Sequence, residues 1–246
     1  MILRPRQKVF VERSLSALDE HGNTLGVASV GFGKTIALSA VVGGYCKTKQ
    51  LRACVIAHSD ELTSQNQRKF KRVIPDISTS VFDAREKSWE GQVTFAMVQT
   101  LSRTAHLVNM PAIDLLVIDE AHHAVSASYR QLIDHIKQRN PQAAIYGVTA
   151  TPGRGDGRGL RPVFSNIADQ VQMSEIIRDG HLVPPRTFMV DVGTRDALSK
   201  VNRTVDDFDM VAVADIMDKQ VINEEVVKHW KEQAGNRKTV VFCSTV

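Results

Sequence analysis

Gly31, Gly33, Lys34 and Thr35 lie close together in a segment whose residue types suit phosphate binding, directly after an apolar run at 25–27. In a tight loop before a helix, the backbone N–H groups point at a bound anion and the helix dipole favours its negative charge. Glycines permit the positive φ angles and close approach that such a loop needs. The lysine would contact the β- and γ-phosphates, and the threonine hydroxyl would bind Mg²⁺. We therefore expect an ATP and Mg²⁺ site that contains Val30, Gly31, Phe32, Gly33, Lys34 and Thr35.

Two features of this segment leave alternatives open. The strict eight-residue pattern begins with glycine, whereas this segment begins with Ala28. Glycine-rich turns also bind dinucleotides, but the third glycine of that pattern would fall at Ile36, and Gly-Lys-Thr is not part of it. The remaining alternative is an ordinary turn that carries an exposed lysine.

A second chemical group follows another apolar run, where residues 114–118 lead into Asp119 and Glu120. In an open α/β sheet, ligands bind at the carboxyl ends of the strands, so these carboxylates can meet the phosphate loop of another strand. Asp119 would hold Mg²⁺ directly or through its water shell. Glu120 would orient and deprotonate the water that attacks the γ-phosphate. With Lys34, these two residues are the catalytic candidates.

The acidic pair is also compatible with a helix cap or with a metal cluster. Carboxylates at a strand end commonly cap the next helix, where the dipole favours their charge. A metal cluster would consist of Asp119, Glu120, His122 and His123, but the segment lacks the HExxH spacing and has no cysteine nearby. Two halves of one phosphate site in the right order are harder to obtain by chance than either alone, which favours the nucleotide site.

The elements that must position these residues alternate along the chain. Short β-branched runs recur at 25–30, 53–57, 93–97, 115–118, 145–148 and 187–192. Helical patterns follow several of them, at 35–45, 61–72 and 128–139. Such alternation indicates βαβ units. The predicted fold class is therefore α/β, a parallel sheet with helices on both faces.

The composition is that of an ordinary globular protein. The 246 residues are 43% hydrophobic and 24% charged, with a formal net charge of +4. These values exclude a disordered, collagenous or coiled-coil chain, and the charge is compatible with nucleic acid without requiring it. Cys46, Cys54 and Cys243 form no zinc-binding spacing and indicate a reducing compartment. No run reaches the ~18 to 20 apolar residues of a membrane span, so we expect a cytoplasmic protein without membrane contact.

We expect three segments along the chain. Residues 1–192 form a first domain, and 193–237 form a polar linker followed by helices near 208–217 and 221–230. The apolar residues 238–246 predict a strand, and a parallel partner would need a crossover that the chain does not supply. We therefore expect the first strand of a truncated second domain, with an edge strand of the only sheet as the alternative. The glycines at 153–159 predict a mobile loop.

Together, the motifs resemble those of a superfamily-two helicase or translocase. Gly-Phe-Gly-Lys-Thr and Asp-Glu-Ala-His occur as in the DEAH-containing members. Segments similar to the Q motif and motifs Ia, Ib, III and IV follow the family's order, at 3–7, 57–65, 98–101, 149–152 and 240–244. Segments 154–160 and 176–184 are similar to the repair-helicase and restriction-translocase branch. The resemblance implies the N-terminal one of two RecA-like P-loop NTPase domains.

The resemblance also implies roles for single residues. It assigns adenine recognition to Gln7, with Arg4. Residues of the acidic motif and motif III are implied to couple phosphate chemistry to nucleic-acid contact. Residues of motifs Ia and Ib are implied to contact the nucleic acid. The first group is His122, Thr149 and Thr151, and the second is His58 and Thr100. Each is also compatible with an ordinary role as a cap, surface or hydrogen-bonded core residue.

Two functions fit these observations. The first is an ATP-dependent nucleic-acid motor, with DNA favoured over RNA, which hydrolyses ATP to ADP and phosphate between this domain and a second RecA-like domain. In the family, arginines of the second domain reach the γ-phosphate, and such arginines are worth ~10³ to 10⁵ in rate. We therefore expect this chain alone to bind ATP better than it hydrolyses it. The alternative is a nucleotide-gated DNA-binding or regulatory module without motor activity.

Overall fold

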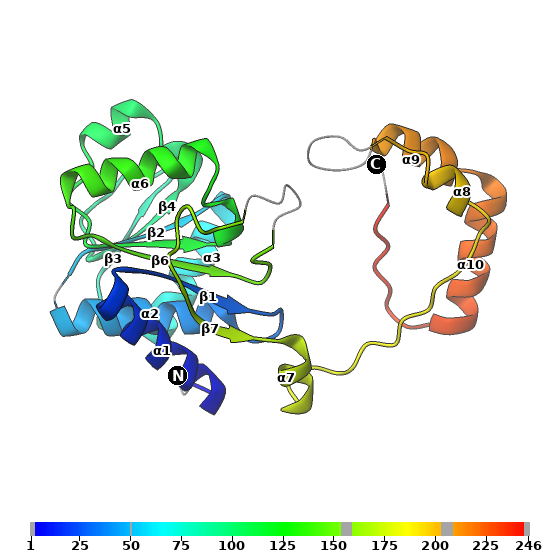
Figure 1. The fold of residues 1–246 in the computed structure, drawn as a ribbon, viewed down its shortest axis with the longest axis horizontal. Helices are drawn as coiled ribbons and strands as arrows, with labels where there is room; N and C mark the ends of the chain where they lie inside the picture. The colour runs from blue at the N-terminus through cyan, green and yellow to red at the C-terminus, as the bar shows by residue number, and fades with distance from the viewer. Residues whose placement is uncertain (1–2, 50, 154–158, 203–208, 244–246) are drawn as a thin grey trace. The chain divides into compact units, whose positions relative to one another are not determined.

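The computed structural model describes residues 3–49, 51–153, 159–202 and 209–243. The chain divides into two units, the first ending at Val183 and the second beginning at Pro184. All the strands belong to the first unit (Figure 1). The mobile loop predicted at 153–159 falls mostly outside the described residues.

The first unit is built on a seven-stranded sheet in the order β3-β4-β2-β5-β6-β1-β7, and each paired neighbour is parallel. The strands are β1 (Asn23–Ala28), β2 (Ala53–Ala57), β3 (Thr79–Phe82), β4 (Val93–Met97), β5 (Leu115–Asp119), β6 (Ala144–Thr149) and β7 (Ile167–Val171). Five of the six apolar runs form strands as predicted. The parallel α/β fold class is confirmed.

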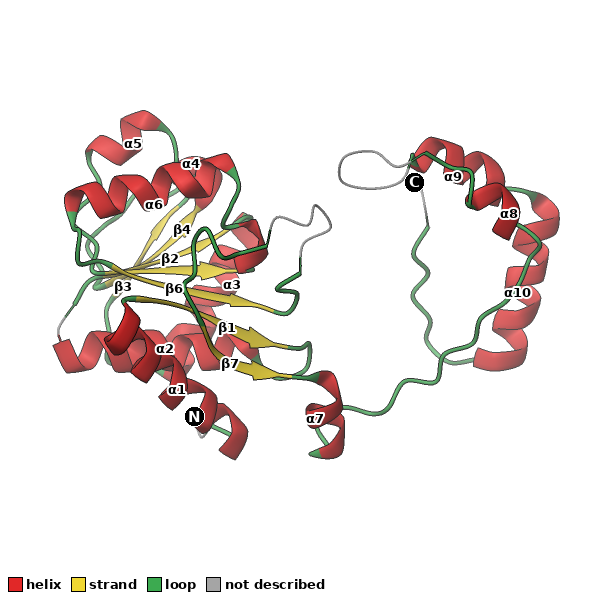
Figure 2. Cartoon of the chain, in the orientation of Figure 1, coloured by secondary structure: helices red, strands yellow, loops and turns green. Residues whose placement is uncertain are grey.

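Helices cover both faces of this sheet (Figure 2). One face carries α1 (Pro5–His21), α2 (Lys34–Lys49) and α3 (Asp60–Val73), and the other carries α4 (Val98–Leu101), α5 (Thr104–Val108) and α6 (Ala127–Arg139). Along β5, Leu115 and Val117 pack into the first core, and Leu116 and Ile118 pack into the second. Burial on both faces explains why these strands are continuous apolar runs rather than alternating ones.

The strand order brings three carboxyl ends together. Strand β6 lies between β1 and β5, and its register pairs Val27 with Thr149 and Asp119 with Val148. The segment after β1, the end of β6 and the end of β5 therefore meet at one edge of the sheet. These are the segments that hold the predicted phosphate loop, Thr149 and the acidic pair.

Three regions differ from the prediction. The edge strands β3 and β7 lie in segments without a strong apolar run. No strand forms at 187–192. The first contact unit ends at Val183, and the domain boundary at residue 192 stays a prediction. Pro184 and Pro185 lack backbone N–H groups, so the segment leaves the sheet without a ladder. In the first unit, α7 (Met173–Arg178) follows β7, and the 3₁₀ helix η1 (Ala121–His123) follows β5.

The second unit contains α8 (Arg195–Leu198), α9 (Met210–Met217) and α10 (Gln220–Ala234). The last two confirm the helices expected near 208–217 and 221–230. Residues 238–243, the described part of the expected terminal strand, have no β-ladder partner, and a truncated second domain stays a prediction. Among the described residues, no helix is long and apolar enough to cross a membrane.

Candidate nucleotide-binding site

The glycine-rich segment forms a tight loop at the start of α2. Gly31 and Gly33 both have φ of +85°, the left-handed conformation that favours glycine. The Phe32 N–H donates to the Ser29 carbonyl at 3.3 Å, and the helix begins at Lys34. The loop therefore has the backbone conformation that the predicted anion site requires, and anion binding itself stays a prediction.

Phe32 anchors the loop, and Val30 does not. The Phe32 side chain is 3% exposed, and its ring centroid lies 5.1 Å from that of Phe10 on α1. Val30 is 66% exposed. Only the backbone of Phe32 is available to a nucleotide, because its ring is buried in the core.

The acidic pair lies opposite the loop. Lys34 Nζ is 3.5 Å from Glu120 Oε1. Asp119 is buried, and its Oδ1 accepts the backbone N–H of Glu120 at 3.0 Å. Burial raises the pKa of Asp119 above its ordinary value, although a hydrogen bond from Asn66 acts in the opposite direction. The cation, the candidate base and the candidate metal ligand therefore lie together.

Glu120 has an unusual backbone. Its φ is +52°, and among the described residues it is the non-glycine residue with positive φ. Such a conformation costs about 1 to 3 kcal/mol and occurs often at functional sites. The turn separates β5 from η1, and it places Glu120 between the side chains of Lys34 and His122.

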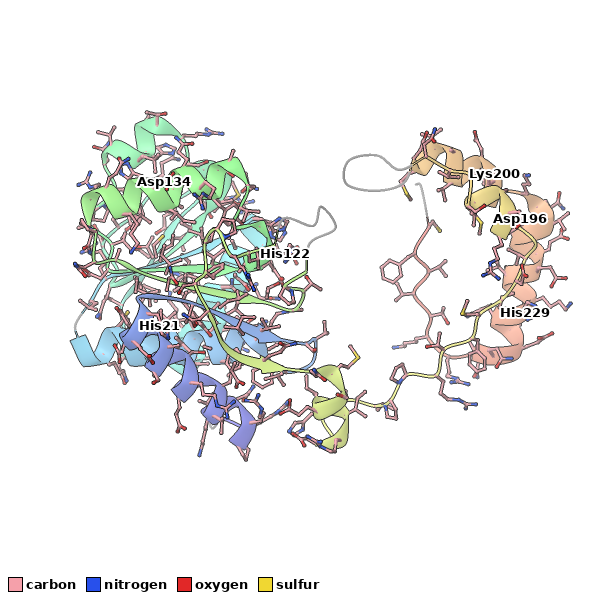
Figure 3. All side chains as sticks on the ribbon, in the orientation of Figure 1. His21, His122, Asp134, Asp196, Lys200 and His229 are labelled. Atoms are coloured by element: carbon pink, nitrogen blue, oxygen red, sulfur yellow. The ribbon has the colours of Figure 1, made fainter. Side chains whose placement is uncertain are left out.

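The three coupling candidates lie together. His122 Nδ1 is 3.4 Å from Glu120 Oε2 and 3.2 Å from the Thr149 hydroxyl. The Thr149 Oγ1 also accepts the Thr151 N–H at 3.2 Å. Figure 3 labels His122 at the edge where the central strands end. The end of β6 is therefore linked through one histidine to the candidate base.

Gln7 connects α1 to the loop. It is 5% exposed, its Nε2 donates to the Phe32 carbonyl at 2.8 Å, and its Oε1 accepts the Arg4 N–H at 3.0 Å. A small pocket opens beside it. The pocket is lined by Arg4, Arg6, Gln7, Phe32, Val171, Ile176, Asp179 and His181.

The two candidate nucleic-acid contacts differ in exposure. His58 is exposed, and its ring centroid lies 5.2 Å from that of His123. Thr100 is 3% exposed, and its carbonyl lies 2.7 Å from His106 Nδ1. The Thr100 side chain therefore presents little surface, and the exposed residues next to it are Gln99 and Arg103.

The alternative of a histidine and carboxylate metal cluster gains no support. Within the part of the chain that the structure describes, no group of three or more His, Cys, Asp or Glu side chains is placed to hold a metal ion.

Sequence reasoning missed two contacts near the site. Asn66 of α3 donates a hydrogen bond to Asp119 at 2.8 Å. The sequence pattern that could have indicated this contact is a polar residue on the same helix face as Thr63 and Phe70. Asp169 of β7 pairs with Arg6 and Arg13 of α1. No local pattern marks these two ion pairs, because Asp169 is far from Arg6 and Arg13 in the sequence.

Comparisons with known proteins identify a family and several relatives. Residues 1–154 match the family described as "Type III restriction enzyme, res subunit". The chain is 29% identical to a Saccharomyces cerevisiae protein named as ATP-dependent helicase IRC3, and 28% identical to a Schizosaccharomyces pombe protein named as mitochondrial ATP-dependent helicase irc3. These alignments cover 98% and 99% of this chain but 37% and 41% of the relatives. The chain thus spans less than half of their length.

Among solved structures, the helicase domain of Pyrococcus furiosus Hef has a TM-score of 0.63 at 21% identity, over 94% of this chain and 55% of that one. This likeness shows a shared fold. The family match covers more than half of the chain and includes both the phosphate loop and the acidic pair. The chain therefore belongs to the family described as "Type III restriction enzyme, res subunit", and its first unit is the N-terminal RecA-like domain of a superfamily-two helicase.

Proposed function

We propose that this chain is the ATP-binding half of a DNA-dependent ATPase, which works as a helicase or translocase when paired with a second RecA-like domain. One observation carries the proposal: Lys34 Nζ lies 3.5 Å from the Glu120 carboxylate, beside the buried Asp119. A phosphate-binding cation, a base and a metal ligand are thereby gathered where the loop begins α2.

The Lys34–Glu120 pair gives each residue a role in turnover. With nucleotide bound, the ammonium group of Lys34 would turn to the phosphates, which carry more negative charge than one carboxylate. Glu120 would then be free to orient the attacking water and accept its proton. His122 contacts both Glu120 and Thr149, so a change in the position or charge of Glu120 would be transmitted through His122 to the end of β6.

The oxygen groups near the loop fit Mg²⁺. Thr35 offers a hydroxyl and Asp119 a carboxylate, and hard oxygen donors are the ligands that this ion prefers. The buried Oδ1 of Asn66 has no hydrogen-bond partner among the described residues, and it belongs to the side chain that holds Asp119. The ion supplies neutralising charge to the phosphates when bound. Thr35 and Asp119 would hold it.

Adenine would bind at the surface beside Gln7 and Arg4, because the pocket next to Gln7 is too small to hold a purine. Gln7 and Arg4 provide the polar groups there. Each Gln7 polar atom has one partner in the fold, which leaves one N–H and one lone pair for a base.

DNA is the partner that we favour. The family description names a restriction enzyme, whose substrate is DNA, and the motifs resemble the repair-helicase and restriction-translocase branch. Contact through His58 and the motif around Thr100 stays a prediction. A cytoplasmic location also stays a prediction, and one relative is named as mitochondrial.

The test uses the full-length protein and measures ATP binding by calorimetry and turnover by phosphate release, with duplex DNA, RNA or neither. Lys34→Ala should abolish ATP binding. Glu120→Gln should retain binding and lose turnover, because an amide cannot accept the proton of water. Lys47→Ala is the matched control, since this exposed lysine of the same helix pairs with Asp76.

Normal turnover by Glu120→Gln would overturn the assignment of the base. DNA-stimulated turnover supports the motor, whereas ATP binding and turnover that ignore polynucleotide would support the nucleotide-gated module. Stimulation by RNA and not by DNA would reverse the choice of partner.

A further inference from the structure

Asn66 is a buried amide on the inward face of α3. It is 1% exposed, and its neighbours on that face are Thr63 and Phe70, both buried. A polar side chain in such a position costs free energy unless its atoms are hydrogen-bonded. The energetic cost of burying Asn66 therefore depends on the partners of its two amide atoms.

The nitrogen of this amide bonds to the carboxylate of Asp119. Asn66 Nδ2 donates to Asp119 Oδ2 at 2.8 Å, while the other carboxylate oxygen accepts the Glu120 N–H at 3.0 Å. One donor on each oxygen fixes the plane of the carboxylate between α3 and the turn after β5. Each oxygen keeps a further lone pair for a cation or its water.

The oxygen of the amide, Asn66 Oδ1, is buried, and no hydrogen-bond partner for it exists among the described residues. A buried acceptor without a partner calls for a donor that arrives from outside the fold. Mg²⁺ keeps several of its waters when a protein binds it through one or two carboxylates. Such a water is a suitable donor.

The neighbouring amides of α3 do not share this contact. Gln65 Oε1 accepts from Lys69 Nζ at 3.1 Å, and Gln67 Nε2 donates to the Thr79 hydroxyl at 3.1 Å. Of the three consecutive amides, Asn66 is the one bonded to the acidic strand end.

We propose that Asn66 is a positioning residue for the metal site, with its amide N–H orienting Asp119 and its carbonyl accepting a hydrogen bond from a metal-bound water. The inference rests on the proposed nucleotide function and names a residue that tunes its metal affinity. Outer partners of metal ligands typically change metal affinity by about 10- to 100-fold when removed. Asn66 should act through Mg²⁺ and leave metal-free nucleotide binding unchanged.

The experiment titrates ADP into the 246-residue chain by calorimetry, once with Mg²⁺ and once with EDTA. Asn66→Ala removes the whole amide, and Asn66→Leu removes the polar atoms at similar size. Both should reduce the Mg²⁺-dependent gain in affinity about tenfold or more, with affinity in EDTA unchanged. Titration with Mn²⁺ followed by electron paramagnetic resonance should show the same loss for the cation itself.

The control is Asn140→Leu. Asn140 Nδ2 donates to Asp114 Oδ1 at 3.1 Å, an amide–carboxylate bond just before the amino end of β5. It should lower stability and leave the Mg²⁺ gain intact. Asn66→Ser, a smaller change, gives the same comparison should the other two variants not fold.

Folded Asn66 variants that keep the full Mg²⁺ gain would overturn this inference alone. A wild-type chain that binds ADP without any Mg²⁺ gain would instead remove the metal site of the proposed function, and this inference with it.

Discussion

The side-chain amide of Gln7 donates a hydrogen bond to the backbone carbonyl of Phe32 at 2.8 Å, which joins α1 to the phosphate loop. The rings of Phe10 and Phe32 reinforce the connection at a centroid distance of 5.1 Å. Because both contacts reach the same loop residue, the candidate adenine site and the candidate phosphate site form one structural unit. A change at Gln7 should therefore alter the binding of phosphate as well as the binding of adenine.

Gln7→Glu tests this connection. A carboxylate cannot donate to the Phe32 carbonyl, and burying it beside that oxygen is unfavourable. A hydrogen bond of this kind contributes about 1 kcal/mol, so we expect ATP affinity to fall by about fivefold or more in calorimetry. The affinity for inorganic triphosphate, which has no base, should fall too. Gln67→Glu, which disturbs the bond to Thr79, is the control. Unchanged triphosphate affinity in Gln7→Glu would contradict the connection.

Thr149→Val tests the contact between His122 and motif III. The Thr149 side chain is fully buried, and its hydroxyl lies 3.2 Å from His122 Nδ1. Valine keeps the shape and loses the hydroxyl, so His122 loses a partner that orients its ring. We expect the ratio of DNA-stimulated to unstimulated ATPase in the full-length protein to fall several-fold, with ATP still bound.

Thr94→Val is the matched control for that variant. Its buried hydroxyl, on β4, bonds to Ser80 of the edge strand β3 at 2.9 Å, away from the site. Equal loss of stimulation in both variants would mean that destabilisation, rather than the His122 contact, explains the effect.

The sequence was most informative where the chemistry is local. The loop at 28–35 and the acidic pair each depend on a few consecutive residues, and both lie where a parallel sheet predicts. Strand β7 was missed because its segment, Ile-Ala-Asp-Gln-Val, mixes apolar and polar residues, as suits an edge strand with one ladder partner. Residues 187–192 have the apolar pattern of a strand, but they have no β-ladder partner among the described residues. Contacts such as Arg6 with Asp169 depend on tertiary structure alone.

Asp169 should make stability depend on pH. Burial alone would raise its pKa, but hydrogen bonds and charge from Arg6 and Arg13 outweigh burial and hold the pKa below its ordinary value of 3.8. A carboxylate with a lowered pKa stabilises the fold above its unfolded pKa, and that contribution disappears as the pH falls through the folded value. Asp169→Asn should therefore destabilise the chain by about 1 to 3 kcal/mol at pH 7.

Urea unfolding at pH 7 and at pH 3 measures this dependence. The difference between wild type and Asp169→Asn should shrink at the lower pH. Asp76→Asn, which alters an exposed pair with Lys47, should change stability by less than about 1 kcal/mol at either pH. A difference that grows on acidification would show that the ion pairs of Asp169 do not stabilise the fold.

Gly31 is constrained twice, by its backbone and by a neighbour. Its φ of +85° costs an L-residue about 1 to 2 kcal/mol, and an added Cβ would lie 2.6 Å from the Leu182 side chain. Gly31→Ala should therefore lower stability and weaken ATP binding at least tenfold, because the loop backbone must shift.

Leu182→Ala removes the steric clash with the added methyl group and leaves the backbone strain at residue 31. In a double-mutant cycle followed by urea unfolding, the double variant should be more stable than the sum of the single changes predicts. Strict additivity would mean that Leu182 does not constrain the loop.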